Sequence, residues 1–234
     1  MTGLRGRLVV VTGAGGALGV ETSRRLLAAG ARVAAVDHRA ENLEASAAEF
    51  GADYLPFVVD LLDEPATLAW GHELAQDHGG VGGLLHLVGG WRGGKGIVDA
   101  DLADWDFLHD NLIRTLQHTS RALHDSLRAS SDARLAIISS TGVAKPTATN
   151  ASYVAAKAAS EAWTLAVADS FDGSHAAAVV LRVMALLTPQ MRADKPNAKF
   201  SGFTPVEQVA GALLALWDEP ADRVNGRIVD LTTS

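Results

Sequence analysis

The sequence predicts an α/β protein whose single domain is built on a doubly wound parallel sheet of about seven strands. Short runs rich in valine, leucine and alanine recur along the chain, as expected of strands that are buried on both faces. Segments with helical character lie between these runs, which is the order that parallel strands with right-handed crossover helices require. The first strand is followed by a glycine-rich turn that leads directly into a helix.

The composition agrees with one domain and excludes some classes of binding partner. The 234 residues are 48% hydrophobic, which suffices for one well-filled domain over 1–234 and is short for two. No apolar run approaches the ~18–20 residues of a membrane span, and the first strand begins too early to leave space for a signal peptide. The net charge of −7 without a basic cluster disfavours nucleic acid and acidic membrane surfaces. We therefore expect a cytoplasmic protein without membrane contact.

Cysteine and histidine usage removes further classes of chemistry. The chain has no cysteine, which excludes disulfides, thiolate metal ligands and cysteine nucleophiles. Its eight histidines show no ligand spacing, so we expect no metal site. His86 lies inside an apolar strand and is interpreted as a buried packing residue rather than a catalyst.

The first unit, residues 8–37, predicts a dinucleotide site. A strand at 8–11 leads through the glycine-rich turn into a helix at 20–29 and a second strand that ends on Asp37. Glycines allow backbone N–H groups to approach a pyrophosphate, and the helix N-terminus adds a dipole that favours the anion. The Asp37 carboxylate can accept hydrogen bonds from both hydroxyls of an adenosine ribose. This pattern is typical of a Rossmann-type fold.

Further helices and strands alternate up to the middle of the chain. They are a helix at 41–50, a strand at 54–59, a helix at 65–77, a strand at 84–88 and a long helix at 103–128. Asp60 is interpreted as the N-cap of the helix at 65–77. Asn111 lies inside the long helix, where asparagine is unfavourable because its side chain competes for backbone hydrogen bonds. Arg92 and Lys95 lie on a glycine-rich loop and are expected to be solvated.

The second half of the chain continues the alternation. The predicted elements are a strand at 134–140, a helix at 151–171, a strand at 176–183, a helix from Thr204 to about 217 with capping-box character, and a strand at 227–231. The segment 190–202 is polar with few apolar anchors, so we expect it to be irregular and mobile. Ligands bind where parallel strands end, and we expect the residues that follow strand ends to converge there. These residues are Gly13, Asp37, Asp60, Gly89, Ser140 and Thr188.

Tyr153 and Lys157 form a candidate proton-transfer pair. They are four residues apart, so on a helix they share one face. A free tyrosine has a pKa near ~10, and a neighbouring ammonium group favours the phenolate and lowers that pKa. Tyr153 would thereby become a usable general acid or base. Ser140, at the end of the preceding strand, could hydrogen-bond the same oxygen of a bound carbonyl.

Together these residues resemble the short-chain dehydrogenase/reductase family over nearly the whole chain. The resemblance rests on the turn 12–19, Thr-Gly-Ala-Gly-Gly-Ala-Leu-Gly, in which Ala17 replaces a glycine, and on a serine thirteen residues before Tyr-x-x-x-Lys. It implies a catalytic tetrad of Asn111, Ser140, Tyr153 and Lys157. Tyr153 would pass the proton and Ser140 would orient the substrate oxygen. Lys157 would hold the nicotinamide ribose and tune Tyr153, while Asn111 would support a water relay.

The same resemblance implies the cofactor and its contacts. Asp60 would contact the adenine and Thr188 the nicotinamide carboxamide, although Val183-Met184 replaces the family's Pro-Gly. We expect NAD, with NADH preferred because Asp37 would repel a 2′-phosphate, and NADP possible because Arg39 lies nearby. The implied cofactor-binding residues are Gly13, Gly15, Gly16, Ala17, Leu18, Gly19, Asp37, Asp60, Leu61, Val88, Gly89, Gly90, Tyr153, Lys157 and Thr188.

Other segments look like the dihydropteridine reductases within this family. These are Val88-Gly89-Gly90-Trp91, the alanine in the glycine turn, and the stretches 187–192 and 203–207. That subgroup uses NADH to reduce a quinonoid pterin, yet it lacks a serine at the position of Ser140. Trp91 would be a stacking wall for a flat substrate or a hydrophobic cap at a strand end, and both interpretations stay open.

Three functions follow as hypotheses. The leading one is an NAD(H)-dependent oxidoreductase that transfers a hydride to or from a carbonyl or alcohol carbon of a small molecule, with Tyr153 as general acid/base. The second is reduction of a quinonoid pterin or a related C=N substrate. The third is a non-catalytic nucleotide-sensing protein, against which the intact tetrad argues. We expect the protein to form a homodimer or homotetramer.

Overall fold

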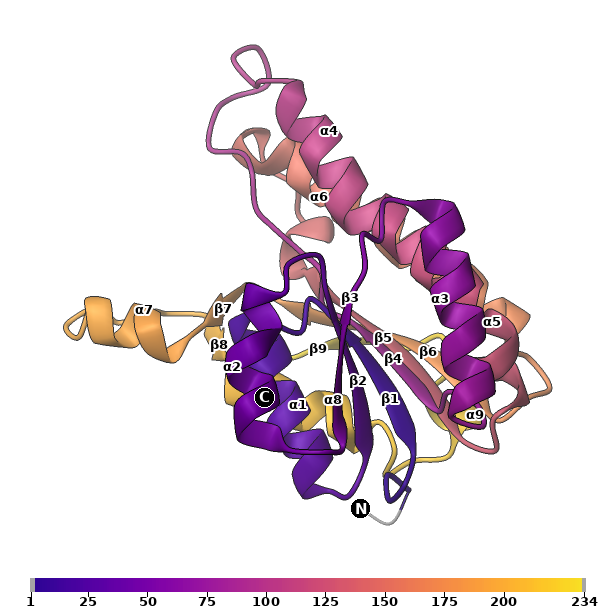
Figure 1. Ribbon diagram of the computed structural model, residues 1–234. Helices are drawn as coiled ribbons and strands as arrows, with labels where there is room; N and C mark the ends of the chain where they lie inside the picture. Colours follow the sequence, from indigo (N-terminus) through magenta and orange to yellow (C-terminus); the bar gives the residue numbers. More distant parts are fainter. Residues whose placement is uncertain (1–2, 233–234) are drawn as a thin grey trace.

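The computed structural model describes residues 3–232 and is built on a seven-stranded parallel sheet (Figure 1). The strand order is β3-β2-β1-β4-β5-β6-β9, so the chain crosses over between β3 and β4. This confirms the predicted α/β, Rossmann-type sheet of about seven strands. The strands are β1 Leu8–Thr12, β2 Arg32–Asp37, β3 Tyr54–Val58, β4 Gly83–His86, β5 Ala133–Ser140, β6 Ala176–Val183 and β9 Ile228–Asp230.

Helices cover both faces of the sheet because the strands are apolar on both sides. Val9 and Val11 of β1 face one core, and Leu8 and Val10 face the other. The first core is covered by α1 Ala17–Ala28, α2 Glu41–Phe50, α8 Val206–Ala215 and α9 Ala221–Val224. The second core is covered by α3 Glu64–Asp77, α5 Thr115–Ala129 and α6 Ala151–Ser170.

The predicted helix at 103–128 contains a wider turn at its centre. It divides into α4 Ala103–His109, a π-helical turn Asp110–Arg114 and α5. Asn111 lies in this turn, where its side-chain amide donates to the Phe107 carbonyl at 2.8 Å. Turns of this kind are frequent at functional sites. The turn therefore accounts for an asparagine that the periodicity of an ordinary helix left unexplained.

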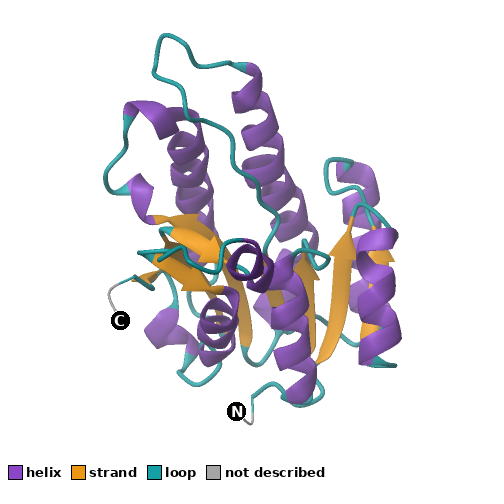
Figure 2. Cartoon of the chain, turned by 90° about the vertical axis from the view of Figure 1, so that its left-hand side faces the viewer, coloured by secondary structure: helices purple, strands orange, loops and turns teal. Residues whose placement is uncertain are grey.

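A small unit follows β6 in the chain and projects beyond the sheet, to the left in Figure 1. It consists of the parallel pair β7 Ala185–Leu187 and β8 Phe203–Pro205, with α7 Pro189–Asp194 between them (Figure 1). In Figure 2, which is viewed from that side, α7 lies in front of the sheet. The prediction of an irregular segment at 190–202 was therefore wrong for its first residues, because Pro189 and the Thr188 cap begin a helix.

Other predicted boundaries were also displaced. Thr204 lies in β8, and α8 begins at Val206 without a side-chain cap, so the predicted capping box is absent there. The strands predicted at 84–88 and 227–231 end earlier, at His86 and Asp230. Across residues 3–232, none of the helices combines the length and the apolar character needed to cross a membrane.

Candidate active site

The glycine turn between β1 and α1 is tightly packed. Gly13 has φ +68°, a left-handed conformation that favours glycine. A Cβ on Gly15 would lie 2.4 Å from the Asn42 Cβ, and one on Gly19 would lie 2.4 Å from the Gly13 carbonyl oxygen. Ala17 is already the first residue of α1, where alanine is favourable. The departure from the expected glycines within this turn thus falls at a helical position, where alanine is the better residue.

Asp37 stands at the end of β2 with its carboxylate fixed toward the turn. Its Oδ1 accepts a 2.7 Å hydrogen bond from the Asn42 amide, and its Oδ2 accepts a longer one, 3.4 Å, from the Gly15 N–H. The side chain is only 8% exposed. Because Asn42 also packs against Gly15, the ribose-binding candidate and the glycine turn form one connected structure.

A cavity of about 620 Å³ lies beside Asp37 and the glycine turn. Among the predicted residues, it is lined by Gly13, Gly15, Gly16, Asp37, Asp60, Leu61, Val88, Gly89 and Asn111. Asp60 does not cap α3, contrary to the prediction. Its Oδ1 accepts from the Leu62 N–H, and Asp63 is the residue whose side chain caps the helix.

A second cavity of about 730 Å³ continues from the first. The two share residues 87–89, which follow β4, so they adjoin each other at the carboxyl edge of the sheet, and we call them together the cleft. Among the predicted residues, the second cavity is lined by Leu18, Val88, Gly89, Gly90, Ser140, Tyr153 and Lys157. Residues far apart in the chain therefore converge as expected from the strand order.

The Tyr153 and Lys157 pair is arranged differently from the expectation. The Lys157 Nζ lies 5.8 Å from the Tyr153 ring centroid and donates to the Ile138 carbonyl at 2.7 Å. Burial raises the pKa of Tyr153, since the phenolate would lose its hydration. The predicted lowering of that pKa by Lys157 is therefore wrong for this arrangement.

Lys157 itself is buried, and the pKa of its ammonium group is lowered. Burial lowers the pKa of its ammonium group to about 8, and the charge of Glu161, one turn later on α6, acts in the opposite direction. Glu161 is 5% exposed and accepts hydrogen bonds from the Ser139 hydroxyl at 2.6 Å and from the Arg182 guanidinium. Lys157 consequently stays mostly protonated at neutral pH, supported by a carboxylate that no sequence motif singled out.

Ser140 and Asn111, the other two residues of the predicted tetrad, line different cavities. Ser140 is 6% exposed at the end of β5, and its Oγ accepts from the Gly142 N–H at 3.1 Å. Asn111 lines the first cavity rather than the second. Ser160 of α6 donates to the Leu112 carbonyl, which ties the π-helical turn to the helix that bears Tyr153.

Thr188 is one of three predicted residues that line neither cavity, the others being Ala17 and Gly19. Its hydroxyl accepts from the Met191 N–H at 3.1 Å and so caps α7. It lines neither cavity. The residues after it do reach the second cavity, because α7 and β8 contribute Met191 and Phe203 to the lining.

Sequence reasoning missed several residues of the second cavity. They are Asn150, Met184, Leu186, Met191 and Phe203. Met184 had been noted only as part of the departure from Pro-Gly, and no local pattern identified the others. Trp91 also lines this cavity while remaining 56% exposed. Arg92 does not, because its guanidinium stacks 4.1 Å from the Phe107 ring centroid.

His86 behaves as the predicted packing residue. It is 4% exposed and shares hydrogen bonds with the hydroxyls of Thr12 at 2.9 Å and Thr115 at 3.2 Å. Burial, helped by the nearby Lys157 charge, lowers the pKa of the imidazole to about 3. His86 is therefore neutral near pH 7 and joins β1, β4 and α5 behind the cleft.

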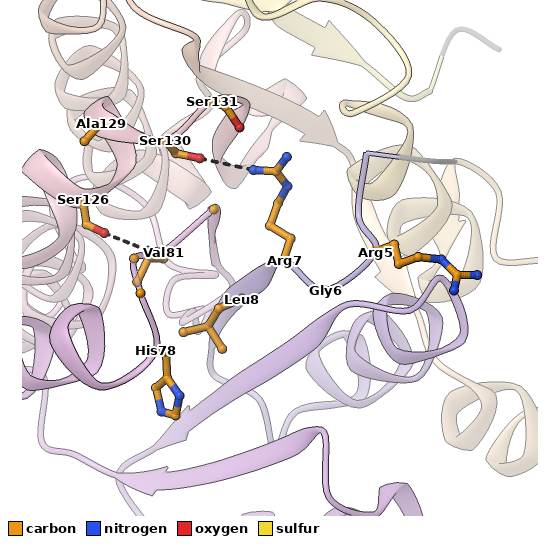
Figure 3. A pocket seen from close by; sticks show the side chains of 13 residues that line it. Arg5, Gly6, Arg7, Leu8, His78, Val81, Ser126, Ala129, Ser130 and Ser131 are labelled. Carbon is orange, nitrogen blue, oxygen red and sulfur yellow. Dashed lines mark hydrogen bonds between the residues drawn. The ribbon is translucent and has the colours of Figure 1, made fainter.

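A third hollow, of about 470 Å³, lies at the opposite edge of the sheet (Figure 3). The guanidinium of Arg7 is held there by the Ser130 hydroxyl and the Gly3 carbonyl, whereas Arg5 points away. Its cations do not converge, and we assign no site to it. Within residues 3–232, no cluster of three or more His, Asp or Glu side chains could hold a metal ion.

Comparison with known proteins agrees with this geometry. The family model for short chain dehydrogenases matches residues 7–198. Nodulation protein G of Rhizobium sp. (strain N33) is 35% identical over 157 residues, which are 66% of this chain and 63% of that protein. This chain therefore spans less than two thirds of the length of that relative.

Two solved structures share the fold at low sequence identity. A short chain dehydrogenase from Shigella flexneri 2a, complexed with NADP, is 20% identical with a TM-score of 0.87 over 100% of both chains. An NAD⁺-bound xylitol dehydrogenase is 19% identical with a TM-score of 0.85 over 97% of this chain and 98% of that chain.

Proposed function

This chain belongs to the short-chain dehydrogenase family, and from that premise we propose that it is an NAD(H)-dependent oxidoreductase acting on a carbonyl or alcohol carbon of a small molecule. The observation that carries the proposal is the single cleft that joins the glycine turn and Asp37 to Ser140, Tyr153 and Lys157. A dinucleotide has two ends, and this cleft has a recognition residue at one end and proton-transferring groups at the other.

The cofactor fits the residues that would hold it. Gly15 and Gly19 leave no space for a Cβ, so the turn brings the backbone close to the cleft, where α1 begins. Asp37 would accept from the ribose hydroxyls and would repel a 2′-phosphate, which supports NADH over NADPH. Arg39 is exposed on the rim and could pair with such a phosphate if it turned inward. When bound, the reduced nicotinamide supplies the hydride.

Tyr153 and Ser140 would act on the substrate oxygen. Because burial raises the pKa of Tyr153, its hydroxyl stays protonated near pH 7, which favours donation to an oxygen that is gaining negative charge. The Ser140 hydroxyl would donate to the same oxygen. Lys157 would bind the nicotinamide ribose once its ammonium leaves the Ile138 carbonyl, and Asn111 would support a water relay. The arrangement thus favours reduction.

Reduction of a quinonoid pterin is the second candidate. The large exposed ring of Trp91 in the second cavity favours it, since a flat substrate could stack there. Ser140 opposes it, because the dihydropteridine reductases lack a serine at that position, and the relatives and structures compared above do not include a pterin reductase. The nucleotide-sensing alternative has no observation in its favour.

The proposed function is tested with Tyr153→Phe. NADH consumption by the wild type is measured against a panel of carbonyls, imines and quinonoid dihydropterin, and NADH binding is measured separately. The variant should lose ~10²–10⁴-fold in turnover with NADH binding nearly unchanged, because the hydroxyl is needed only for proton transfer. Activity above about a tenth of the wild-type value would show that another group carries the proton.

A further inference from the structure

The outer part of the second cavity is a separate, apolar region that the proton chemistry does not use. On one side stands Trp91, in the loop after β4. Met184, Met191 and Phe203, which we call the methionine wall, line the same cavity and come from the segments after β6. Trp91 and Met184 are 56% and 47% exposed, so apolar side chains that line this cavity also reach solvent.

Both sides of this region are held in place. The Trp91 ring lies over its own loop, 3.5 Å from where a Gly93 Cβ would be, and the Gly94 N–H donates to the Thr149 carbonyl at 2.8 Å. Thr149 comes just before α6, so the position of the ring is linked to that of Tyr153. Met184 lies against Gly202, where a Cβ would be 2.8 Å from its sulfur. Trp91 and Met184, which both line the second cavity, are thus each held by neighbouring backbone.

Apart from Lys157, which the proposed function assigns to the cofactor, the pocket offers no cation to a negatively charged substrate. Its lining contains no Asp, Glu or Arg, and its ionisable side chains are His86, Tyr153 and Lys157. His86 is neutral and hydrogen-bonded, and the Lys157 ammonium is engaged by the Ile138 carbonyl. The cations of the projecting unit, Arg192, Lys195 and Lys199, are exposed and outside the lining. A carboxylate or phosphate on the substrate body would lose hydration here without compensation.

We propose that the substrate is an uncharged aromatic carbonyl compound, whose ring lies between Trp91 and the methionine wall and whose carbonyl points toward Ser140 and Tyr153. An indole face and two thioethers are groups that make favourable contacts with an aromatic ring. The proposal rests on the proposed function. In the reaction the carbonyl carbon gains a hydride from the reduced nicotinamide and the oxygen gains the Tyr153 proton. The products are the alcohol and the oxidised cofactor, and Tyr153 regains its proton from solvent.

The test compares methyl 4-formylbenzoate, which is neutral, with 4-carboxybenzaldehyde, which carries a carboxylate on the same ring. With NADH, the ester should have a kcat/KM at least about tenfold higher. Trp91→Ala should lower kcat/KM for the ester by about tenfold, chiefly through KM, while Trp91→Phe keeps most of it. Val98→Ala is the matched control, since Val98 is 95% exposed on the same loop and outside the cavity.

Met184 provides an independent variant that leaves the Trp91 loop unchanged. Met184→Lys should reverse the preference in favour of the carboxylate, and Met184→Leu should retain the preference for the ester. A wild-type kcat/KM for 4-carboxybenzaldehyde that equals or exceeds the kcat/KM for methyl 4-formylbenzoate overturns the inference. So does a failure of the ester both to turn over and to bind, by calorimetry, to the NADH-loaded protein. Turnover of other carbonyls in that case would leave the proposed function standing, whereas a failure to bind NADH would remove both.

Discussion

The pKa values of His86, Tyr153 and Lys157 in the cleft are shifted chiefly by burial. Tyr153 and Lys157 were expected to act on one another, but each is governed first by the loss of hydration around it. Burial disfavours the charged form of both side chains, so it acts against the phenolate and against the ammonium. Glu161 offsets part of the effect on Lys157, because its carboxylate favours the charged lysine.

His86 should make the stability depend on pH. Its pKa is about 3 in the folded protein, below the ordinary value of 6.5, so below pH 6.5 the unfolded chain binds a proton that the folded one does not. The stabilisation is present above pH 6.5 and is lost as pH falls toward 3. Between pH 7 and pH 5 the free energy of unfolding should drop by about 2 kcal/mol from this residue alone.

Denaturant unfolding at the two pH values checks this expectation. His86→Gln removes the titrating group while keeping a side chain that can hydrogen-bond Thr12 and Thr115, and the extra pH dependence should disappear. His72→Gln, on the exposed side of α3, is the control and should retain it. An imidazole resonance of His86 that titrates between pH 5 and pH 7 would contradict the expectation without needing a variant.

Ser140 separates the two candidate reactions. For a ketone or an aldehyde, charge builds on oxygen, and removing a donor aimed at that charge typically costs ~10²–10³-fold in kcat. A quinonoid pterin delocalises the charge, so its reduction should tolerate Ser140→Ala within about tenfold, or roughly 1.4 kcal/mol. We expect the large loss. Steady-state kinetics on the substrate found by the panel, with NADH binding measured separately, decides the matter, and a near-wild-type kcat would favour the pterin reaction.

At the scale of elements, two local irregularities shape the cleft. The π-helical turn at Asp110–Arg114 brings Asn111 to the first cavity. The hydroxyl of Ser160 in α6 donates a hydrogen bond to the Leu112 carbonyl of this turn. The projecting unit of β7, α7 and β8 supplies Met191 and Phe203 to the second cavity. Both the π-helical turn and the projecting unit interrupt the regular alternation of strands and helices, and both contribute residues to the lining of the cleft.

The projecting unit should be mobile until the cleft is filled. α7 has six residues, and most side chains in 190–202 are exposed, so little apolar burial holds them. Amide hydrogens of 190–202 should exchange rapidly in the free protein and more slowly with NADH and substrate bound. The amides of α8, which packs against α1, serve as the internal reference. Equal protection of 190–202 in both states would indicate a rigid unit.

At the scale of the whole molecule, the order of the strands explains why the two cavities lie next to each other. The crossover between β3 and β4 opens the edge of the sheet at β1 and β4, and both cavities meet there at 87–89. A ligand that fills both cavities therefore contacts elements from both halves of the chain. Binding of such a ligand should stabilise the fold as a unit.

NADH should accordingly raise the midpoint of thermal unfolding more than NADPH at equal concentration. A ligand at a hundred times its Kd stabilises by about 2.7 kcal/mol, and the Asp37 carboxylate should weaken NADPH binding selectively. Asp37→Asn should reduce the difference between the shifts in unfolding midpoint that NADH and NADPH cause. Asp77→Asn removes one negative charge at the exposed end of α3, away from the cleft, and should leave the difference unchanged. A larger shift with NADPH in the wild type would contradict the assignment of NADH. The oligomeric state stays a prediction.

What the sequence alone determined is what depends on neighbours along the chain. The unit from β1 to Asp37, the spacing of Tyr153 and Lys157 and the buried character of His86 all follow from hydrophobic period, turn glycines and strand ends. These features predicted the parallel sheet and several of the residues that line the cleft.

What only the tertiary structure decided depends on groups that are distant along the chain. Thr188 caps a helix that the polar composition of 190–202 did not predict. The methionine wall forms because three separate segments contribute to the lining of one cavity. The direction of the Tyr153 pKa follows from how completely surrounding elements remove water from its hydroxyl. Desolvation is a property of the packed surroundings, and no spacing along the chain encodes it.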